Sequence, residues 1–279
     1  MIASMRAELL RLSKWPATWV VIGVWLTLNL SFGYVFDYLN YREAVNGGDQ
    51  RIADALLSQL SLTGVPTTMV SGLPMFGGAL VLILAALATG SGYGWSTWRT
   101  VFTQGPRRLA VLGGTMLALA VLLALLAVLT LAADLVASSI VMTATSQDLT
   151  WPGVGTLAEG LAGALAIIAM WAAAGTMVGI VARSPALSVG LGLVWMLVVE
   201  NLLRGVAGLL GPLESVTDFL PGTAAGSLAG AIGAATEIEE GGAPGVFTVL
   251  TGTQSIAVLA GYLVTFILAA ALVMSRRDA

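Results

Sequence analysis

Three carboxylates, Asp134, Glu159 and Glu200, stand within or at the edge of long apolar runs, where an acidic side chain is best placed for chemistry. A charge at the centre of a membrane helix costs about 2.5–3.5 kcal/mol on insertion scales, so such residues are usually paired or functional. Asp134 and Glu159 fall near the ends of their runs, where an interfacial snorkelling carboxylate and a functional one remain equal alternatives. Arg204 follows Glu200 at i+4, a spacing that favours an intrahelical ion pair over a proton relay.

Other reactive side chains are scarce. The 279-residue chain has no cysteine and no histidine, which excludes thiolate chemistry, Ser-His catalysis and most zinc sites. The only lysine, Lys14, has no glycine-rich loop before it, so the chain lacks a Walker A site for ATP. We therefore expect a protein that is not an enzyme and that holds no metal or cofactor of its own.

A second candidate site is the polar, aromatic and basic segment 91–108, which separates two apolar runs. Trp95, Trp98 and Phe102 recur at i, i+3 and i+7, which predicts one face of a short helix. Two interpretations fit this face. It could carry movement from a cytoplasmic partner into the bilayer, or it could be an aromatic belt at the membrane interface.

The composition shows which elements must position these residues. The chain is 57% hydrophobic and only 10% charged, against about 25% charged in soluble domains. Six apolar runs are long enough to cross about 30 Å of hydrocarbon as helices. They cover residues 17–36, 65–90, 109–134, 157–181, 186–203 and 255–274. We expect one all-α transmembrane domain over residues 1–279.

Local signals add detail to these spans. Pro74 lies inside the second span and predicts a kink, because proline removes one backbone hydrogen bond. Gly175 and Gly179 in the fourth span have the spacing that lets membrane helices approach closely. Between the first two spans, a turn near Asn46 precedes a short amphipathic stripe made of Ile52, Leu56 and Leu60.

Residues 1–15 predict an amphipathic helix that lies on the membrane surface ahead of the first span. Arg11 and Lys14 fall on the opposite side from its apolar positions. The apolar positions are Ile2, Met5, Leu9 and Leu12.

Residues 204–250, between the last two spans, are too short to cross and too apolar for a free loop. Glycine recurs every four residues at Gly222, Gly226 and Gly230. This pattern predicts one or two short re-entrant or surface helices packed tightly against the spans.

The basic residues indicate the orientation. With the amino terminus inside, nine of them fall on the cytoplasmic side and three outside, as the positive-inside rule requires. We therefore expect both termini and the segment 91–108 in the cytoplasm. No basic patch lies away from the membrane, which argues against nucleic-acid binding. The nine residues are Arg6, Arg11, Lys14, Arg99, Arg107, Arg108, Arg183, Arg276 and Arg277.

These features resemble the membrane subunit of ABC-2-type exporters, bacterial permeases that pair with a separately encoded ATPase. The stretch 93–108 looks like the cytoplasmic segment of that family, and Glu200 followed by Leu220-Pro221 is also similar. The layout of an amphipathic elbow helix, six spans and short helices between spans five and six extends the resemblance over nearly the whole chain. Two departures are Gly92 and Thr115, which stand where the family often has a glutamate and a lysine.

The resemblance implies a bacterial plasma-membrane complex. Two permease copies, or this chain and a sister permease, would form the translocation path for a lipid-like or amphipathic small molecule. Two ATP-binding subunits, which hold the ATP and Mg, would dock on the cytoplasmic coupling segment 91–108, and Gly222, Gly226 and Gly230 would pack the outer gate. The residues implied in ATPase coupling are Trp95, Trp98, Arg99, Phe102 and Arg107.

The main alternative is a proton-coupled secondary transporter that uses Asp134, Glu159 and Glu200. The absence of a detectable internal repeat, and of any broken helix apart from the one at Pro74, argues against it. An intramembrane hydrolase would need a nucleophile with a base, for which the composition provides little. A purely structural scaffold would not explain the aromatic and basic segment.

Overall fold

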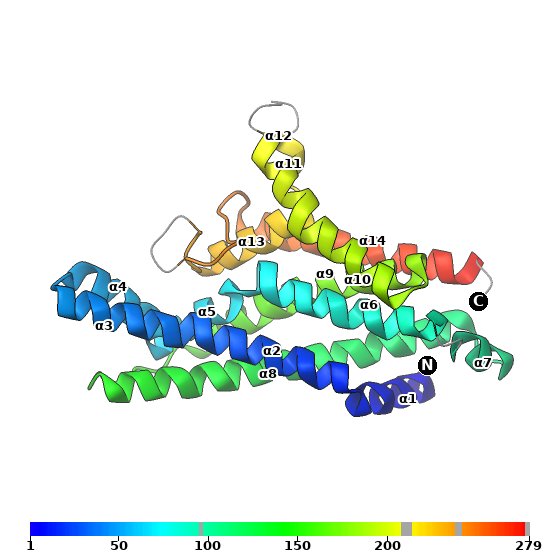
Figure 1. Cartoon of the computed structure of the whole chain (residues 1–279), viewed down its shortest axis with the longest axis horizontal. Coiled ribbons are helices and arrows are strands. Elements are labelled where there is room, and N and C mark those ends of the chain that lie inside the picture. Colours follow the sequence, from blue (N-terminus) through cyan, green and yellow to red (C-terminus); the bar gives the residue numbers. More distant parts are fainter. Residues whose placement is uncertain (95–96, 208–213, 238–241, 277–279) are drawn as a thin grey trace.

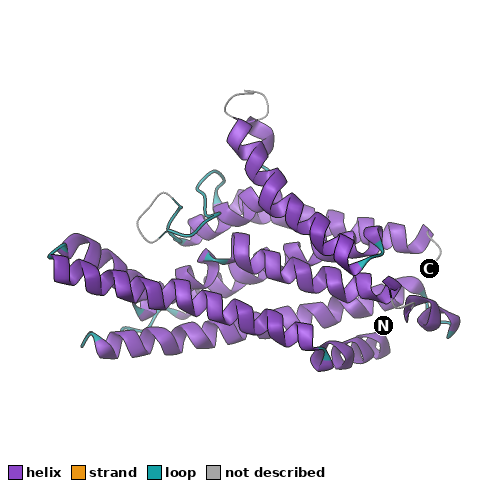
Figure 2. Ribbon diagram, in the orientation of Figure 1, coloured by secondary structure: helices purple, strands orange, loops and turns teal. Residues whose placement is uncertain are grey.

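The computed structural model describes residues 1–94, 97–207, 214–237 and 242–276. Within these ranges every regular element is a helix and no strand occurs (Figure 2). In these described ranges, six helical stretches are long and apolar enough to cross a membrane, which confirms the predicted all-α class with six candidate spans. They are Pro16–Gly47, Leu62–Gly94, Arg108–Ala144, Val154–Ala182, Pro185–Val206 and Gly252–Arg276.

The elements follow one another along the chain with short connections. Those before the third span are α1 (Ile2–Lys14), α2 (Pro16–Leu30), the π-helical turn η1 (Ser31–Phe36), α3 (Asp37–Gly47), α4 (Gln50–Leu60), the 3₁₀ turn η2 (Leu62–Gly64), α5 (Val65–Ser71), the π-helical turn η3 (Leu73–Gly77), α6 (Gly78–Gly94) and α7 (Thr97–Thr103). The later ones are α8 (Arg108–Ala144), α9 (Val154–Ala182), α10 (Pro185–Leu193), the π-helical turn η4 (Val194–Val199), α11 (Glu200–Ala207), α12 (Glu214–Thr217), α13 (Pro221–Ile232) and α14 (Gly252–Arg276).

The long helices run along one axis of the molecule, and α6 and α9 pack against each other in the bundle (Figure 1). The chain start, the chain end and α7 lie at one end, and the α3–α4 corner lies at the other. The α6–α9 contact is close because a Cβ at Gly175 would overlap the Leu82 carbonyl. A Cβ at Gly179 would lie 3.0 Å from the Ala86 carbonyl oxygen, so the predicted glycine packing is confirmed.

Two spans are longer than the apolar runs predict. The first remains helical beyond residue 36 to Gly47, and α8 continues from 134 to Ala144. Polar residues end an apolar run but they do not end helical hydrogen bonding, so the helix stops only where the backbone turns. Gly48 provides that turn after the first span, with a φ of 77°. The amphipathic stripe that follows forms α4, whose side chains Leu56 and Leu60 are buried.

The second span is irregular at the predicted position. Pro74 lies in η3, between α5 and α6. The amides of Phe76 and Gly77 both donate to the Gly72 carbonyl, at 3.1 and 3.0 Å. The bond from Gly77 spans five residues, as in a π-helix, so the span deviates here from regular α-helical geometry.

The helix α13 forms a buried element between the fifth and sixth spans. A Cβ at Gly226 would overlap the Gly245 carbonyl, and one at Gly230 would overlap the Phe247 carbonyl. The Phe247 amide also donates to the Gly226 carbonyl at 3.3 Å. Gly226 and Gly230 therefore let the chain at Gly245 and Phe247 lie directly on α13, whereas Gly222 packs against Glu200 of the fifth span.

The helix α1 packs on α8 rather than standing apart. Leu12 is fully buried, whereas Ile2, predicted on the same apolar face, is 65% exposed. A Cβ at Gly114 of α8 would lie 2.6 Å from Ser4 Cβ and 2.8 Å from the Met5 nitrogen. This contact joins the amino terminus to the third span.

Candidate functional site

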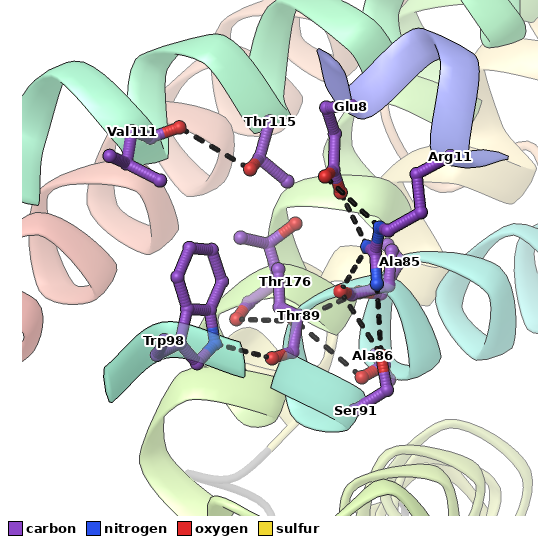
Figure 3. Close-up of polar contacts among 11 residues, drawn as sticks. Glu8, Arg11, Ala85, Ala86, Thr89, Ser91, Trp98, Val111, Thr115 and Thr176 are labelled. Atoms are coloured by element: carbon purple, nitrogen blue, oxygen red, sulfur yellow. Dashed lines mark hydrogen bonds and ion pairs between the residues drawn. The ribbon is translucent and has the colours of Figure 1, made fainter. Parts of the chain in front are cut away.

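Trp98 attaches the short helix α7 to the bundle. Its side chain is 6% exposed, and its indole N–H donates to the Thr89 carbonyl at 3.1 Å (Figure 3). The Thr89 hydroxyl donates in turn to the Ala85 carbonyl at 2.8 Å. The rings of Trp98 and Phe102 stack with centroids 5.7 Å apart. The end of α6 and α7 are thus held together by a buried aromatic side chain.

The resemblance implies Trp98 in ATPase coupling, but its burial leaves little of the ring to contact a partner directly. It packs in a cluster with Val111, Ile180 and Met274, which come from α8, α9 and α14. An aromatic residue at this position can therefore serve the segment as an anchor, while Phe102, which is half-buried, keeps part of its ring accessible.

The other predicted coupling residues are distributed differently. Trp95 and the side chain of Arg99 lie outside the described part of the structure. Arg107 is exposed, directly before α8. The neighbouring Arg108 places its guanidinium 5.6 Å from the centroid of the Phe102 ring, a cation–π contact at the edge of the Trp98 cluster.

Gly92 explains one departure from the resembled family. A Cβ at this position would lie 2.7 Å from Trp98 Cδ1, with other indole atoms closer still. A glutamate here would displace the indole, so glycine at position 92 is what allows Trp98 to pack against the end of α6. Thr115, the other departure, is buried on α8 and donates its hydroxyl to the Val111 carbonyl at 3.3 Å.

Arg11 connects α1 to the same region. Its guanidinium donates to the Ala88 carbonyl at 2.7 Å and to the Ser91 hydroxyl at 3.2 Å, and it pairs with Glu8 on its own helix (Figure 3). The prediction that Arg11 points away from the packed face is wrong. A cation near the carboxyl end of α6 is favourable, and Glu8 compensates its partly buried charge. We call α1, the end of α6, and α7 the helical corner.

Glu200 forms a second polar centre. Its carboxylate is fully buried and accepts from the Trp195 indole at 2.9 Å and from the Gly222 amide at 2.8 Å. Arg204 Nη1 lies 3.7 Å from Glu200 Oε2, so the ion pair predicted from the i+4 spacing is present. Gly222 is in the first turn of α13, where an anion is favourable next to unpaired amides.

Arg204 extends this centre. Its guanidinium donates to the Thr223 hydroxyl at 3.2 Å and to the Asn201 side chain at 2.8 Å. It also lies 4.7 Å from the centroid of the Phe247 ring. Glu200 and Arg204 together connect the fifth span to both α13 and the chain that lies on it.

Asp134 is fully buried in α8, so its carboxylate does not reach out to the surface as a snorkelling side chain would. Its Oδ1 accepts from the Asn29 amide at 2.6 Å, while its Oδ2 has no hydrogen-bond partner among the described residues. Glu159 is exposed near the start of α9. Each of the two buried carboxylates has its own partners, Asn29 for Asp134 and the Arg204 cluster for Glu200, so neither contact joins one carboxylate to the other.

A cavity of about 390 Å³ lies between the first span, the second span and the chain that follows α13, and sequence reasoning missed it. Its wall includes Trp25, Phe32, Phe76 and Asp37, together with Asn29, which bonds Asp134. An aromatic pair at i and i+4 followed directly by an acid was the signal in the first span. The other walls could not be recognised from sequence, because they come from the second span and from the chain around Ala234 and Ala243, far from Phe32 in sequence.

The fold and these centres define an all-helical, multi-pass membrane protein. Protein-family models do not match the chain, and no curated protein matches its sequence. Among the residues that the structure describes, no group of three or more acidic side chains could hold a metal ion.

Proposed function

We propose that the chain is the transmembrane permease subunit of an ATP-driven ABC-2-type exporter. The observation that supports this proposal best is the helical corner. One buried tryptophan holds α7 between the second and third spans, and one arginine holds α1 against the same helix end. A partner that moved α7 would therefore move α6 directly.

The corner suits force transmission because its contacts reach several spans. The Trp98 cluster includes residues of α8, α9 and α14, so displacement of α7 is resisted by the bundle as a whole. The chain has no phosphate-binding loop, so the proposal assigns ATP and Mg to two copies of a separate ATP-binding subunit. That subunit would dock at the corner, on accessible residues such as Phe102 and Arg107.

The Glu200 centre would carry the same movement to the other half of the molecule. Glu200 couples the fifth span to α13 through a hydrogen bond and the ion pair with Arg204. A shift of the fifth span would pull on the start of α13, which the proposal treats as the outer gate. Two permease copies, or this chain and a sister chain, would enclose the path in a bacterial plasma membrane, with both termini in the cytoplasm.

The test is copurification and reconstitution with candidate ATP-binding-cassette ATPases from the source organism. Phe102→Ala and Trp95→Ala should weaken copurification, since buried aromatic anchors at interfaces often cost about 2 kcal/mol or more, roughly thirtyfold in affinity. Arg107→Gln should weaken it less, and mainly at low salt. Trp151→Ala is the matched control, because Trp151 is 63% exposed in the loop before α9.

Two outcomes would contradict the proposal. One is full copurification and unchanged ATP-coupled transport by the Phe102 and Trp95 variants. The other is transport by this chain alone, driven by a proton gradient and abolished by Asp134→Asn. The second outcome would favour the secondary-transporter alternative.

A further inference from the structure

The cavity between the first two spans has an aromatic wall. Phe32 and Phe76 stack with centroids 6.3 Å apart and planes 9° apart, and Phe36 lies 5.2 Å from Phe32. All three rings line the cavity while keeping 39–57% of their surface exposed. Trp25 also lines it, and its indole N–H already donates to the Thr130 hydroxyl at 2.9 Å. These four side chains therefore offer ring surface, and hydrogen-bond donors at the cavity come from polar lining residues such as Asn40 and Gln59.

Asp37 gives this cavity a negative charge. Among the described residues that line it, Asp37 is the only charged side chain. Its carboxylate makes no hydrogen bond or ion pair with another described residue. The nearest arginine in sequence, Arg42, is instead directed to the Tyr38 hydroxyl, at 3.4 Å. A partly buried, unpaired carboxylate is costly, and a cation placed beside it would offset that cost.

The backbone around the cavity is irregular on both sides. The turn η1 contributes Phe32, and the turn η3 contributes Phe76. A Cβ at Gly33 would lie 2.7 Å from Thr68 Cγ2, so the two spans nearly touch at the wall of the cavity. π-helical turns inside longer helices are frequent at functional sites, where they redirect side chains. Here the two turns direct aromatic rings of separate spans to the same space.

We infer that this cavity binds an amphipathic organic monocation. The charged centre lies against Asp37, and the apolar part lies among Phe32, Phe76 and Trp25. Aromatic faces attract cations as well as apolar groups, so the same rings serve both halves of the ligand. The volume of about 390 Å³ lies within the range of roughly 300–1,000 Å³ usual for small-molecule sites. The inference that such a cation is the transported substrate rests on the proposed function. The inference that the cavity binds the cation does not.

The experiment measures binding to the full chain in phosphatidylcholine nanodiscs without any ATPase. Equilibrium dialysis with radiolabelled tetraphenylphosphonium, corrected for empty discs, should show saturable binding. Tetraphenylborate has the same shape and the opposite charge, and it should bind at least tenfold more weakly. Asp37→Asn should weaken binding of the cation at least tenfold and Phe76→Ala severalfold.

Matched controls and a second readout keep the result interpretable. Asp54→Asn and Phe219→Ala remove an exposed acid and an exposed ring outside the cavity, and neither should change the affinity. Since the chain has no cysteine, a single Asn40→Cys at the cavity can report occupancy in otherwise unaltered protein. Tetraphenylphosphonium should slow its alkylation, and tetraphenylborate should not.

Equal binding of the two ions, unchanged affinity in Asp37→Asn, or no saturable binding would overturn the inference. Because no ATPase is present, each of these results would leave the proposed function to its own test. Loss of ATPase association at the helical corner would in turn leave the binding result intact.

Discussion

At Glu200, one buried carboxylate accepts two hydrogen bonds and faces one guanidinium. Removing an ionised group from water is expensive, and the attraction of its partner repays that cost only when its other acceptor sites are also satisfied. The Trp195 indole and the Gly222 amide satisfy one oxygen each. The pair is therefore better understood as a junction between the fifth span and α13 than as a free charge available for proton transfer.

Replacing Glu200 with glutamine should destabilise the detergent-solubilised protein by about 2 kcal/mol. This is less than the 3–5 kcal/mol usual for breaking a buried pair, because Arg204 is partly exposed and keeps two other hydrogen bonds. Adding Arg204→Met should recover part of the loss. The coupling energy from this double-mutant cycle is the measurement, and strictly additive effects would show that the residues act independently. Glu159→Gln, on an exposed carboxylate, should change stability little.

Trp98→Ala should destabilise the isolated chain, even when no partner is present. Loss of a buried aromatic side chain and its hydrogen bond should cost about 3 kcal/mol, the lower part of the range for large-to-small core substitutions. Limited proteolysis should then cleave near α7 faster than in the parent protein. Trp151→Ala should leave the cleavage rate unchanged. If Trp98→Ala affected only ATPase binding, the anchor role would be refuted.

At the scale of elements, sequence reasoning succeeded where the determinants are local. The i+4 pair at Glu200 and the irregularity at Pro74 depend on neighbours within a few residues, and the glycine spacing on α13 is itself a local pattern, although its packing partners lie further along the chain. It failed where partners are distant, as for Arg11 with Ser91, and for Asn29 with Asp134, 105 residues apart. No periodicity in one helix reveals which side chain of another helix it will meet.

The hydrogen bonds from Arg11 to the end of α6 predict how stably α1 as a whole is attached to the bundle. Arg11→Gln removes its ion pair with Glu8 and weakens the bonds to Ala88 and Ser91, which together should contribute about 1–3 kcal/mol. Amide hydrogen exchange in α1 should then accelerate about tenfold or more, while exchange in α9 stays unchanged. Arg6→Gln removes an exposed charge from the same helix and should have little effect. Equal exchange in both variants would mean that α1 is held by its contact with α8 alone.

At the scale of the whole molecule, the even number of spans places both chain ends at the same end of the bundle as α7 (Figure 1). Composition and run length were sufficient to predict this architecture, because a helix is the one way for an isolated apolar segment to satisfy its backbone in lipid. They could not predict the cavity, which depends on how two irregular spans meet.

The same arrangement makes the orientation testable with single cysteines in a chain that has none. Asn46 and Ser146 are exposed at the corners after the first and third spans, and Thr103 is exposed at the end of α7. The excess of basic residues around α7 and the termini predicts that this end faces the cytoplasm. Asn46→Cys and Ser146→Cys should therefore react with an impermeant maleimide added to intact cells, whereas Thr103→Cys should react only after the cells are opened. Labelling of Thr103→Cys from outside, with the other two protected, would show that the predicted orientation is wrong. The helical corner would then face the outside, where a cytoplasmic ATPase could not reach it.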